Sequence, residues 1–268
     1  MNKILPTCLL GLGLLCLSMP ARADHVPGHA KLEWGPAIGL ITTPDYIGSR
    51  SSQNLLVPFP YIKYRGKILR IDDGVEARFF DKPDWILSIS GNGSLPGPKK
   101  NDERIGMDKL DPSVEFGPSL EYRLIHNDDN SLWLELPLRL AVTVAKNVSY
   151  FGKVFHPRLA WRKPAAAKYD WKLRLSAGPL YADKKFLDHF YAVAADEVTP
   201  TRSEYSASAG YAGFRSDFTF SRRFGKYWLG GFIRHDSLIG SIIEDSPLVS
   251  QKQSLTAGIS IAWVISEK

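Results

Sequence analysis

The segment at residues 131–145 alternates apolar and other side chains without a break, and this alternation limits what the chain can fold into. Leucine or valine occupies every even position from Leu132 to Val144, while the odd positions include Glu135 and Arg139. Side chains at period two point to opposite faces of a β-strand. A run of this length can cross a bilayer as a tilted strand, whereas strands of soluble sandwiches usually have about five or six residues.

Alternation recurs along most of the chain and predicts about twelve strands in all. In two of these segments the apolar side switches midway, which a β-bulge in each would explain. We therefore expect an all-β protein that forms a closed antiparallel transmembrane β-barrel. Besides residues 131–145, the predicted strands are 31–41, 54–64, 67–72, 75–80, 85–93, 114–124, 150–162 (switched), 169–177, 204–220 (switched), 226–238 and 254–263.

The lengths of the connections between these strands support a barrel. Every second connection is short, so these short connections all lie at one end of the predicted barrel. The long connections all lie at the other end. Short periplasmic turns and longer outward loops are typical of outer-membrane barrels. The short side holds residues 65–66, 81–84, 126–130, 163–168 and 222–225, and the other side holds 42–53, 94–112, 182–203 and 239–250 with two short connections, 72–74 and 146–149.

The average composition, taken alone, describes a soluble protein. The mean hydropathy is −0.16, and 23% of the residues are charged. A secreted β-sandwich is the alternative fold, because its core strands also alternate. In a barrel, the apolar half of each strand faces lipid and the polar half faces the lumen, so the average conceals two different surfaces. The barrel also explains the segregated connections.

The first 23 residues have the features of a cleaved export signal. Lys3 precedes an apolar stretch at residues 4–19, and Ala21-Arg22-Ala23 is a small-x-small cleavage site. Residues 24–268 would then form the mature barrel in the outer membrane of a Gram-negative cell. Both cysteines lie in the signal, so we expect no disulfide. The mature chain is only mildly basic, which gives no argument for a nucleic-acid partner.

Charged residues of both signs fall on the polar faces of the predicted strands. Such a lumen is either filled by salt bridges or lines a narrow channel. Residues 183–197 place apolar side chains at roughly helical spacing, which predicts a short helix over the barrel mouth. The residues expected in the lumen are Glu115, Glu121, Arg123, Glu135, Arg139, Asp170, Lys172, Arg174 and Arg234.

Enzyme motifs are nearly absent from the sequence. It contains no nucleotide-binding glycine motif and no cysteine-based or His-Glu-x-x-His metal site, so we expect no cofactor and no metal. One weak catalytic candidate is the pair His235 and Ser237, which share one face of a strand. With Glu244 or Asp245 they could form an acyl-transfer triad acting on lipid. A His and a Ser two residues apart often occur by chance, and the prediction is a non-enzymatic protein.

Several segments together resemble the MipA/OmpV family of outer-membrane proteins. They occur in the order of that family over nearly the whole mature chain, although the chain lacks the terminal aromatic residue that members often have. The matching segments are Pro44-Asp45-Tyr46-Ile47-Gly48-Ser49, Pro58-Phe59-Pro60-Tyr61-Ile62-Lys63-Tyr64-Arg65-Gly66, Arg104 with Met107 and Leu110-Asp111, Phe190-Tyr191-Ala192-Val193, and Asp245-Ser246-Pro247-Leu248-Val249.

The resemblance implies a function that the residue patterns do not. It implies a scaffold in peptidoglycan assembly that binds a lytic murein transglycosylase and a penicillin-binding murein synthase. The alternatives are a small-solute channel, which the charged lumen would allow, and a surface adhesin, because other relatives are linked to adhesion. A lipid acyl hydrolase is a further alternative from the His235 pair. We expect the outer face of the barrel to contact outer-membrane lipid. The patterns leave the protein partner, conduction, the ligand or solute and the oligomeric state open.

Overall fold

A computed structural model describes residues 32–66, 69–71, 75–94, 101–127, 129–144, 147–166 and 170–267. The predicted export signal at residues 1–23 lies outside this part of the chain. The described residues form one antiparallel sheet of fourteen segments, with one α-helix and two short 3-10 helices in the connections. No helix in these ranges is both long and apolar enough to cross a membrane.

The segments follow one another around the sheet in chain order. The strands are β1 (Leu32–Pro44), β2 (Ser52–Arg65), β3 (Leu69–Ile71), β4 (Val75–Asp81), β5 (Trp85–Ser94), β6 (Ser113–His126), β7 (Ser131–Thr143), β8 (Tyr150–Phe155), β9 (Arg158–Lys163), β10 (Lys172–Ala182), β11 (Gly210–Phe224), β12 (Tyr227–Ser237), β13 (Gln253–Trp263) and β14 (Ser266–Glu267). The helices are η2 (Asp102–Arg104), α1 (Lys184–Tyr191) and η3 (Ala195–Glu197).

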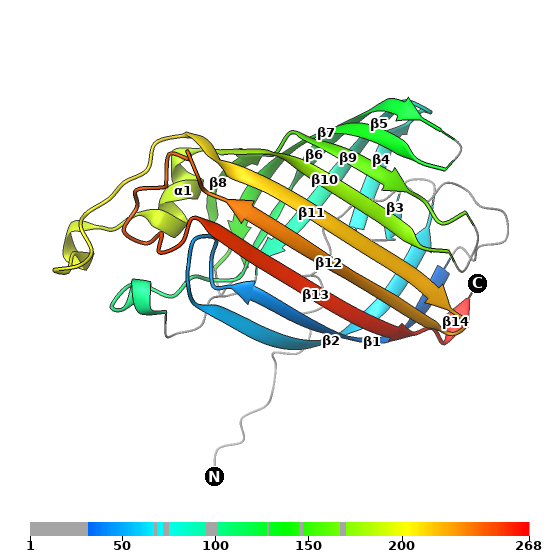
Figure 1. The fold of residues 1–268 in the computed structure, drawn as a ribbon, viewed down its shortest axis with the longest axis horizontal. Coiled ribbons are helices and arrows are strands. Elements are labelled where there is room, and N and C mark those ends of the chain that lie inside the picture. The colour runs from blue at the N-terminus through cyan, green and yellow to red at the C-terminus, as the bar shows by residue number, and fades with distance from the viewer. Residues whose placement is uncertain are drawn as a thin grey trace, which may run out of the picture.

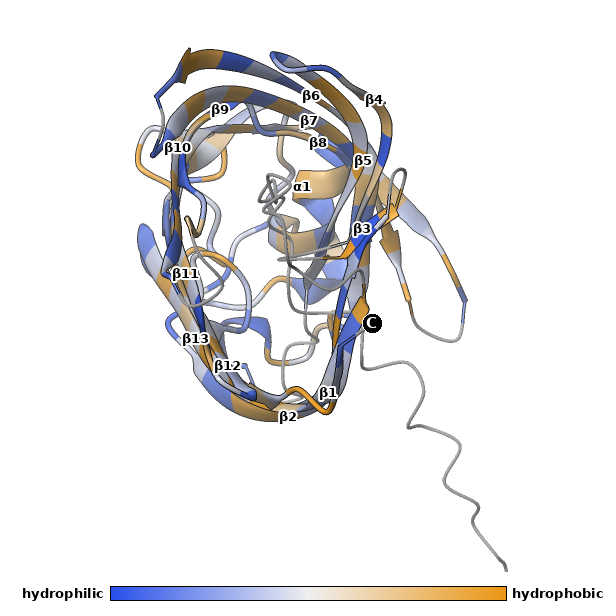
Figure 2. Ribbon diagram, turned by 90° about the vertical axis from the view of Figure 1, so that its right-hand side faces the viewer, coloured by the Kyte–Doolittle hydropathy of each residue, from blue (hydrophilic) through white to orange (hydrophobic). Residues whose placement is uncertain are grey.

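The sheet closes on itself into a barrel of twelve strands. β1 pairs with β2 on one side and with β13 on the other, and β10 pairs with β11. β8 and β9 both lie between β7 and β10, so they are two parts of one strand, and β14 continues β13 along β1. Figures 1 and 2 show the closed ring from the side and from one end. The predicted closed antiparallel barrel of about twelve strands is confirmed.

The side chains follow the predicted alternation, with the polar face inside. In β7, Trp133, Glu135 and Arg139 are buried, while Leu138 and Leu140 are 46% and 40% exposed on the outer surface. Bands of alternating hydropathy run around the ring in Figure 2. Lipid in contact with the outer face favours apolar residues there, which inverts the arrangement of a soluble protein.

Two predicted strands carry the bulges that the switched patterns indicated. Ala141 pairs with Gly152 and Val142 with Tyr150, so Phe151 is the extra residue of β8. Leu180 pairs with Gly213 and Tyr181 with Tyr211, so the other bulge lies at Ala212. Between β8 and β9 the ladder is interrupted at Pro157, which has no N–H to donate.

Some predicted boundaries were wrong. β11 begins at Gly210, and residues 204–209 belong to the preceding connection, where Tyr205 forms a bridge to Val193. β10 starts at Lys172 and runs on to Ala182, beyond the predicted end at residue 177. In β10, Gly178 and Pro179 interrupt the alternation just past the predicted end. Before β11 the opposite occurs, because Tyr205, Ala207 and Ala209 alternate with polar residues in a segment that is a connection.

Long and short connections lie at opposite ends of the barrel, as predicted. We call the end that carries α1 and residues 45–51, 101–112, 183–209 and 238–252 the loop end, and the other the turn end. Figure 1 shows the C-terminus and β14 at the turn end, opposite α1. The Glu33 carboxylate at this end binds Arg65 Nη1 at 2.9 Å and Arg223 Nη1 at 2.7 Å, and Arg223 also binds Glu267 of β14.

Closure of the barrel depends on one glycine at the seam. A methyl group at Gly35 of β1 would overlap the backbone carbonyl oxygen of Trp263 in β13. We expect Gly35→Ala to hinder this pairing and to lower the yield of the heat-modifiable folded band on gels. Gly91→Ala is the matched control, because its methyl group would lie 3.6 Å from the Glu115 carbonyl oxygen, an ordinary contact. Equal folded yields for both variants would contradict this account of the seam.

Candidate functional site

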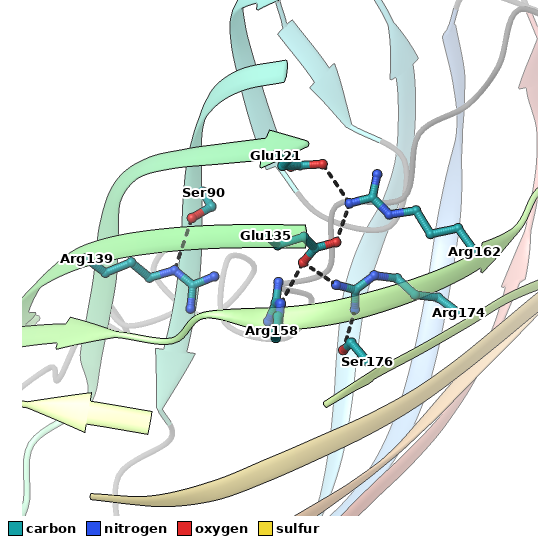
Figure 3. Close-up of polar contacts among 8 residues, drawn as sticks. All are labelled: Ser90, Glu121, Glu135, Arg139, Arg158, Arg162, Arg174 and Ser176. Carbon is teal, nitrogen blue, oxygen red and sulfur yellow. Dashed lines mark hydrogen bonds and ion pairs between the residues drawn. The ribbon is translucent and has the colours of Figure 1, made fainter. Parts of the chain in front are cut away.

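The inner wall is organised around the buried carboxylate of Glu135. Arg158 Nε and Arg174 Nη2 each donate to Glu135 Oε2 at 2.6 Å, and Arg162 donates to Glu135 Oε1. Arg162 also binds Glu121 Oε2 at 2.6 Å. Figure 3 shows these side chains converging from β6, β7, β9 and β10. Strand register brings them together, since Glu135 lies opposite both Glu121 and Arg158.

An arginine-stacked tryptophan extends this network toward the turn end. Trp133 is 1% exposed. The guanidinium carbons of Arg123 and Arg162 lie 4.9 and 4.8 Å from its ring centroid, which permits cation–π attraction. Arg123 also donates to the Pro83 carbonyl oxygen in a turn. Trp133 thus packs among charged groups and belongs to the polar filling of the lumen.

A second group of ion pairs lies on the β11–β12 wall. Arg215 Nε donates to Asp236 Oδ1 at 2.6 Å, and Arg234 Nε donates to Asp217 Oδ1 at 2.7 Å. Each pair consists of residues directly opposite in the register. Charge pairs that face each other across neighbouring strands stabilise that register.

The structure places the predicted lumen residues on the inner side, but several lumen residues were missed. Glu115, Glu121, Glu135, Arg139, Arg174 and Arg234 line or fill the interior, Arg123 stacks on Trp133, and Asp170 and Lys172 line a small cavity at the turn end. The missed charged residues were Glu33, Arg78, Arg158, Arg162, Arg215, Asp217, Arg223 and Asp236. If the alternation had been counted afresh after each bulge, it would have assigned Arg158, Arg162, Arg215 and Asp217 to the lumen.

The loop end is closed by a packed cap, which we define as α1 with residues 45–51, 101–112, 183–209 and 238–252. Leu187, Tyr191 and Val193 pack with Leu248 and Ile243 in one buried apolar cluster. Figure 2 shows α1 within the outline of the ring. The helix predicted within residues 183–197 is confirmed. It begins after Asp183, whose side chain accepts a hydrogen bond from Phe186 N at 2.8 Å and so caps the helix.

Hydrogen bonds join the loops of the cap to one another. Tyr46 Oη donates to the Leu248 carbonyl oxygen at 2.6 Å, and Tyr191 Oη donates to the Ile47 carbonyl oxygen at 2.8 Å. Arg104 Nη1 donates to the Phe190 carbonyl oxygen at 2.9 Å. These contacts connect residues 45–51, 101–112 and 183–209 with 238–252. The cap is therefore one packed unit.

Burial changes the titration of groups in the cap. Desolvation raises the pKa of the Tyr46 phenol above its usual value, and the negative charge of Glu103 adds to the rise. Desolvation, with the positive charge of Arg104, lowers the pKa of His189 to about 4. His189 is therefore neutral near pH 7, and its ring centroid lies 4.1 Å from that of Phe151. Neutrality of both groups suits the apolar packing of the cap.

The weak catalytic candidates alternate along β12 with the ion-paired residues of the inner wall, and Ser237 also borders a cavity in the lumen. His235 and Ser237 share the outer face of β12, because the alternating residues Arg234 and Asp236 point inward. The His235 ring nitrogen Nε2 lies 3.4 Å from Gln253 Oε1, and Glu244 binds Lys252 and the Gly240 N–H. The structure does not join the pair to a carboxylate. Within the described ranges, no group of three or more His, Cys, Asp or Glu residues could hold a metal ion.

The fold and the site together define a capped transmembrane β-barrel with a charged lumen. The family model described as MltA-interacting protein MipA matches residues 37–265. The chain belongs to this family of outer-membrane β-barrels, as the sequence resemblance indicated. No curated protein sequence matches the chain.

Solved structures similar to this chain are remote in sequence. A bacterial polysaccharide outer membrane secretin is 9% identical, with 89% of this chain and 99% of that chain covered and a TM-score of 0.43. The NanC porin is 8% identical, with 84% and 98% covered and a TM-score of 0.42. The outer membrane protein OprG from Pseudomonas aeruginosa is 6% identical, with 88% and 95% covered and a TM-score of 0.24. Such scores carry no argument about function.

Removal of the Glu135 charge should destabilise the barrel strongly. Glu135→Gln leaves three buried arginines without their shared carboxylate, and breaking a buried ion pair costs about 3–5 kcal/mol. We expect a loss of this size in urea unfolding of the protein in lipid vesicles, followed by tryptophan fluorescence. Glu204→Gln, at an exposed position in the loop end, should change stability by less than about 0.5 kcal/mol. Equal effects would contradict a central role for Glu135.

The cap should loosen when its apolar cluster is cut back. Leu187 is 1% exposed, and leucine-to-alanine changes in a core cost about 2–5 kcal/mol. We expect Leu187→Ala to accelerate protease cleavage within residues 183–209 while the folded band on gels persists. The control is Val198→Ala in the same connection, because Val198 is 47% exposed. Cleavage at the wild-type rate in Leu187→Ala would show that the cluster does not hold the cap.

Proposed function

We propose that this chain is a non-enzymatic outer-membrane scaffold in peptidoglycan assembly. In this proposal, it binds a lytic murein transglycosylase and a penicillin-binding murein synthase at the turn end. The description of its family as an MltA-interacting protein supports the first partner. The second partner extends the same role, since joining a hydrolase to a synthase is what a scaffold of murein growth would do.

The observation that carries the proposal is the closed loop end. Cap residues from distant parts of the chain share one apolar cluster over the mouth, and ion pairs built on Glu135 fill part of the lumen beneath it. A barrel closed in this way favours binding at its ends over free passage of solutes. A surface adhesin would use the outer side of the same cap and is the alternative.

Orientation supports contact with periplasmic enzymes. Short turns of outer-membrane barrels face the periplasm, which puts the turn end beside the murein layer. A cleaved signal at residues 1–23 would deliver the chain to this compartment. The ion pairs of Glu33, Arg65 and Arg223 hold Glu267 of β14 at that end. They would give a partner a fixed polar surface.

The positions of the catalytic candidates support a non-enzymatic function. His235 and Ser237 lie on the outer wall, and Glu244 is engaged by Lys252 and the Gly240 N–H. Asp236 points to the opposite side of β12 and binds Arg215. A triad would need a carboxylate oriented toward His235, and Glu244, one of the two carboxylates suggested by the sequence, makes other contacts.

Crosslinking in intact cells tests the scaffold. We expect the wild-type chain, crosslinked and purified, to recover a lytic murein transglycosylase and a penicillin-binding murein synthase. Replacing turn residues 126–130 and 164–166 by glycine and serine should reduce this recovery, because both turns lie at the turn end. Replacing residues 199–201 at the loop end is the matched control and should leave recovery unchanged.

The folded band of each variant on gels must persist for this comparison. Absence of both enzymes from the wild-type sample would refute the scaffold. Recovery that depends on residues 199–201 and not on the turns would place the contact at the loop end and would contradict binding at the turn end.

A further inference from the structure

A cavity of about 220 Å³ lies in the lumen between the cap and the β11–β12 wall. Its charged lining is unbalanced, with five basic side chains against Asp45, Glu115 and Asp236. Apolar and aromatic side chains, among them Trp228 and Phe232, line other parts of it. The volume is below the range of about 300–1,000 Å³ that holds drug-sized ligands. Charge and size together suit a small anion. The basic side chains are Arg139, Lys172, Arg174, Arg215 and Arg234.

Among the four arginines of this cavity, Arg139 has the weakest contact with a carboxylate. Its Nη1 lies 3.8 Å from Glu115 Oε2. The corresponding distances are 2.6 Å for both Arg174 and Arg215 and 2.7 Å for Arg234. Arg139 Nε donates to Ser90 Oγ at 3.1 Å, as Figure 3 shows. The positive charge of Arg139 is therefore not neutralised by a carboxylate in close contact.

The same side chain has a donor with no protein partner. Arg139 is 4% exposed, and its Nη2 is buried without a hydrogen bond to the described residues. Arg174 Nε is also buried without a hydrogen bond to the described residues. A buried cationic donor without an acceptor is costly, and an anion bound beside it would offset that cost. The planar guanidinium matches carboxylate geometry.

Several charged side chains surround Arg139. Arg158, Arg215 and Arg234 lie close enough to act electrostatically on Arg139, and Glu115 is the carboxylate that opposes them. Asp217 and Asp236 are already engaged by Arg234 and Arg215. These two pairs are therefore close to neutral, and the charges that remain to act on Arg139 are those of Arg158 and Glu115. A low-dielectric wall increases the effect of such charges.

The cavity extends toward the turn end, where it adjoins a second one. A smaller cavity of about 50 Å³ there shares Lys172, Ser221 and Trp228 with the larger one. Four basic side chains line it, against two acidic ones, and this excess attracts anions. The cap closes the opposite end. The basic side chains are Lys63, Arg65, Lys172 and Arg223, and the acidic ones are Glu33 and Asp170.

We propose that the lumen binds a small organic carboxylate from the periplasmic side. Its carboxylate would lie on Arg139, on the side of the cavity that Arg215 and Arg234 also line. This site is independent of the scaffold role, because it lies inside the barrel and the proposed enzyme contacts lie on the turns outside it. Either proposal can fail without the other.

Calorimetric titration of the folded full-length barrel in detergent micelles tests the site. Glucuronate is the probe, and glucose at the same ionic strength is the neutral control with the same ring. We expect saturable binding of glucuronate and none of glucose. Arg139→Gln should weaken glucuronate binding at least about ten-fold, the effect of losing one charge-assisted pair. Arg123→Gln is the matched control, because Arg123 does not line the cavity, and it should bind like wild type.

A second variant covers failure of Arg139→Gln to fold. Arg139→Lys keeps the positive charge and loses the planar fork, so glucuronate binding should weaken several-fold and remain detectable. Equal responses to glucuronate and glucose, no saturable glucuronate binding by the wild type, or wild-type affinity in the folded Arg139 variants would each overturn the proposal.

Discussion

The structure depends on hydrogen bonding of the backbone in lipid. A strand that lies in a bilayer finds no water for its N–H and C=O groups, so each strand needs a partner on both sides. The chain meets this requirement by pairing β1 with β13 and β10 with β11. Closure fixes an inner and an outer face for every strand. The apolar half then faces lipid, and the polar half has to be accommodated in the lumen.

Charges in that lumen are stable only as partners of one another. Glu135 is 0% exposed and binds three arginines, while Arg215 with Asp236 and Arg234 with Asp217 form opposed pairs. Each pair satisfies its charges only in one strand register, so the network also specifies how the strands align. Arg139 is the exception, with its distant carboxylate and unpartnered donor. Among the arginines of the lumen cavity, Arg139 is therefore the one least neutralised by the protein.

Regular alternation made most of the fold predictable from sequence. Residues 131–145, 114–124 and 254–263 alternate strictly, and their strands and faces were predicted. Where a bulge inserts one residue, at Phe151 or Ala212, the two sides of the bulge have opposite parity. Arg158, Arg162, Arg215 and Asp217 were missed for that reason. The cap contacts were also beyond prediction, because Tyr46 and Leu248 are 202 residues apart in the chain and no local pattern connects them.

The alternation that assigned Arg234 to the lumen also places the side chains of His235 and Ser237 on the outer wall.

The cap and the charge network together close the lumen. Single-channel recording of the folded protein in planar bilayers measures whether the lumen conducts. We expect no reproducible conductance steps from the inserted wild-type barrel, because the apolar cluster around Leu187 and Tyr191 covers the mouth. Reproducible steps of constant size from the wild-type protein would contradict this expectation and would establish the barrel as an open channel.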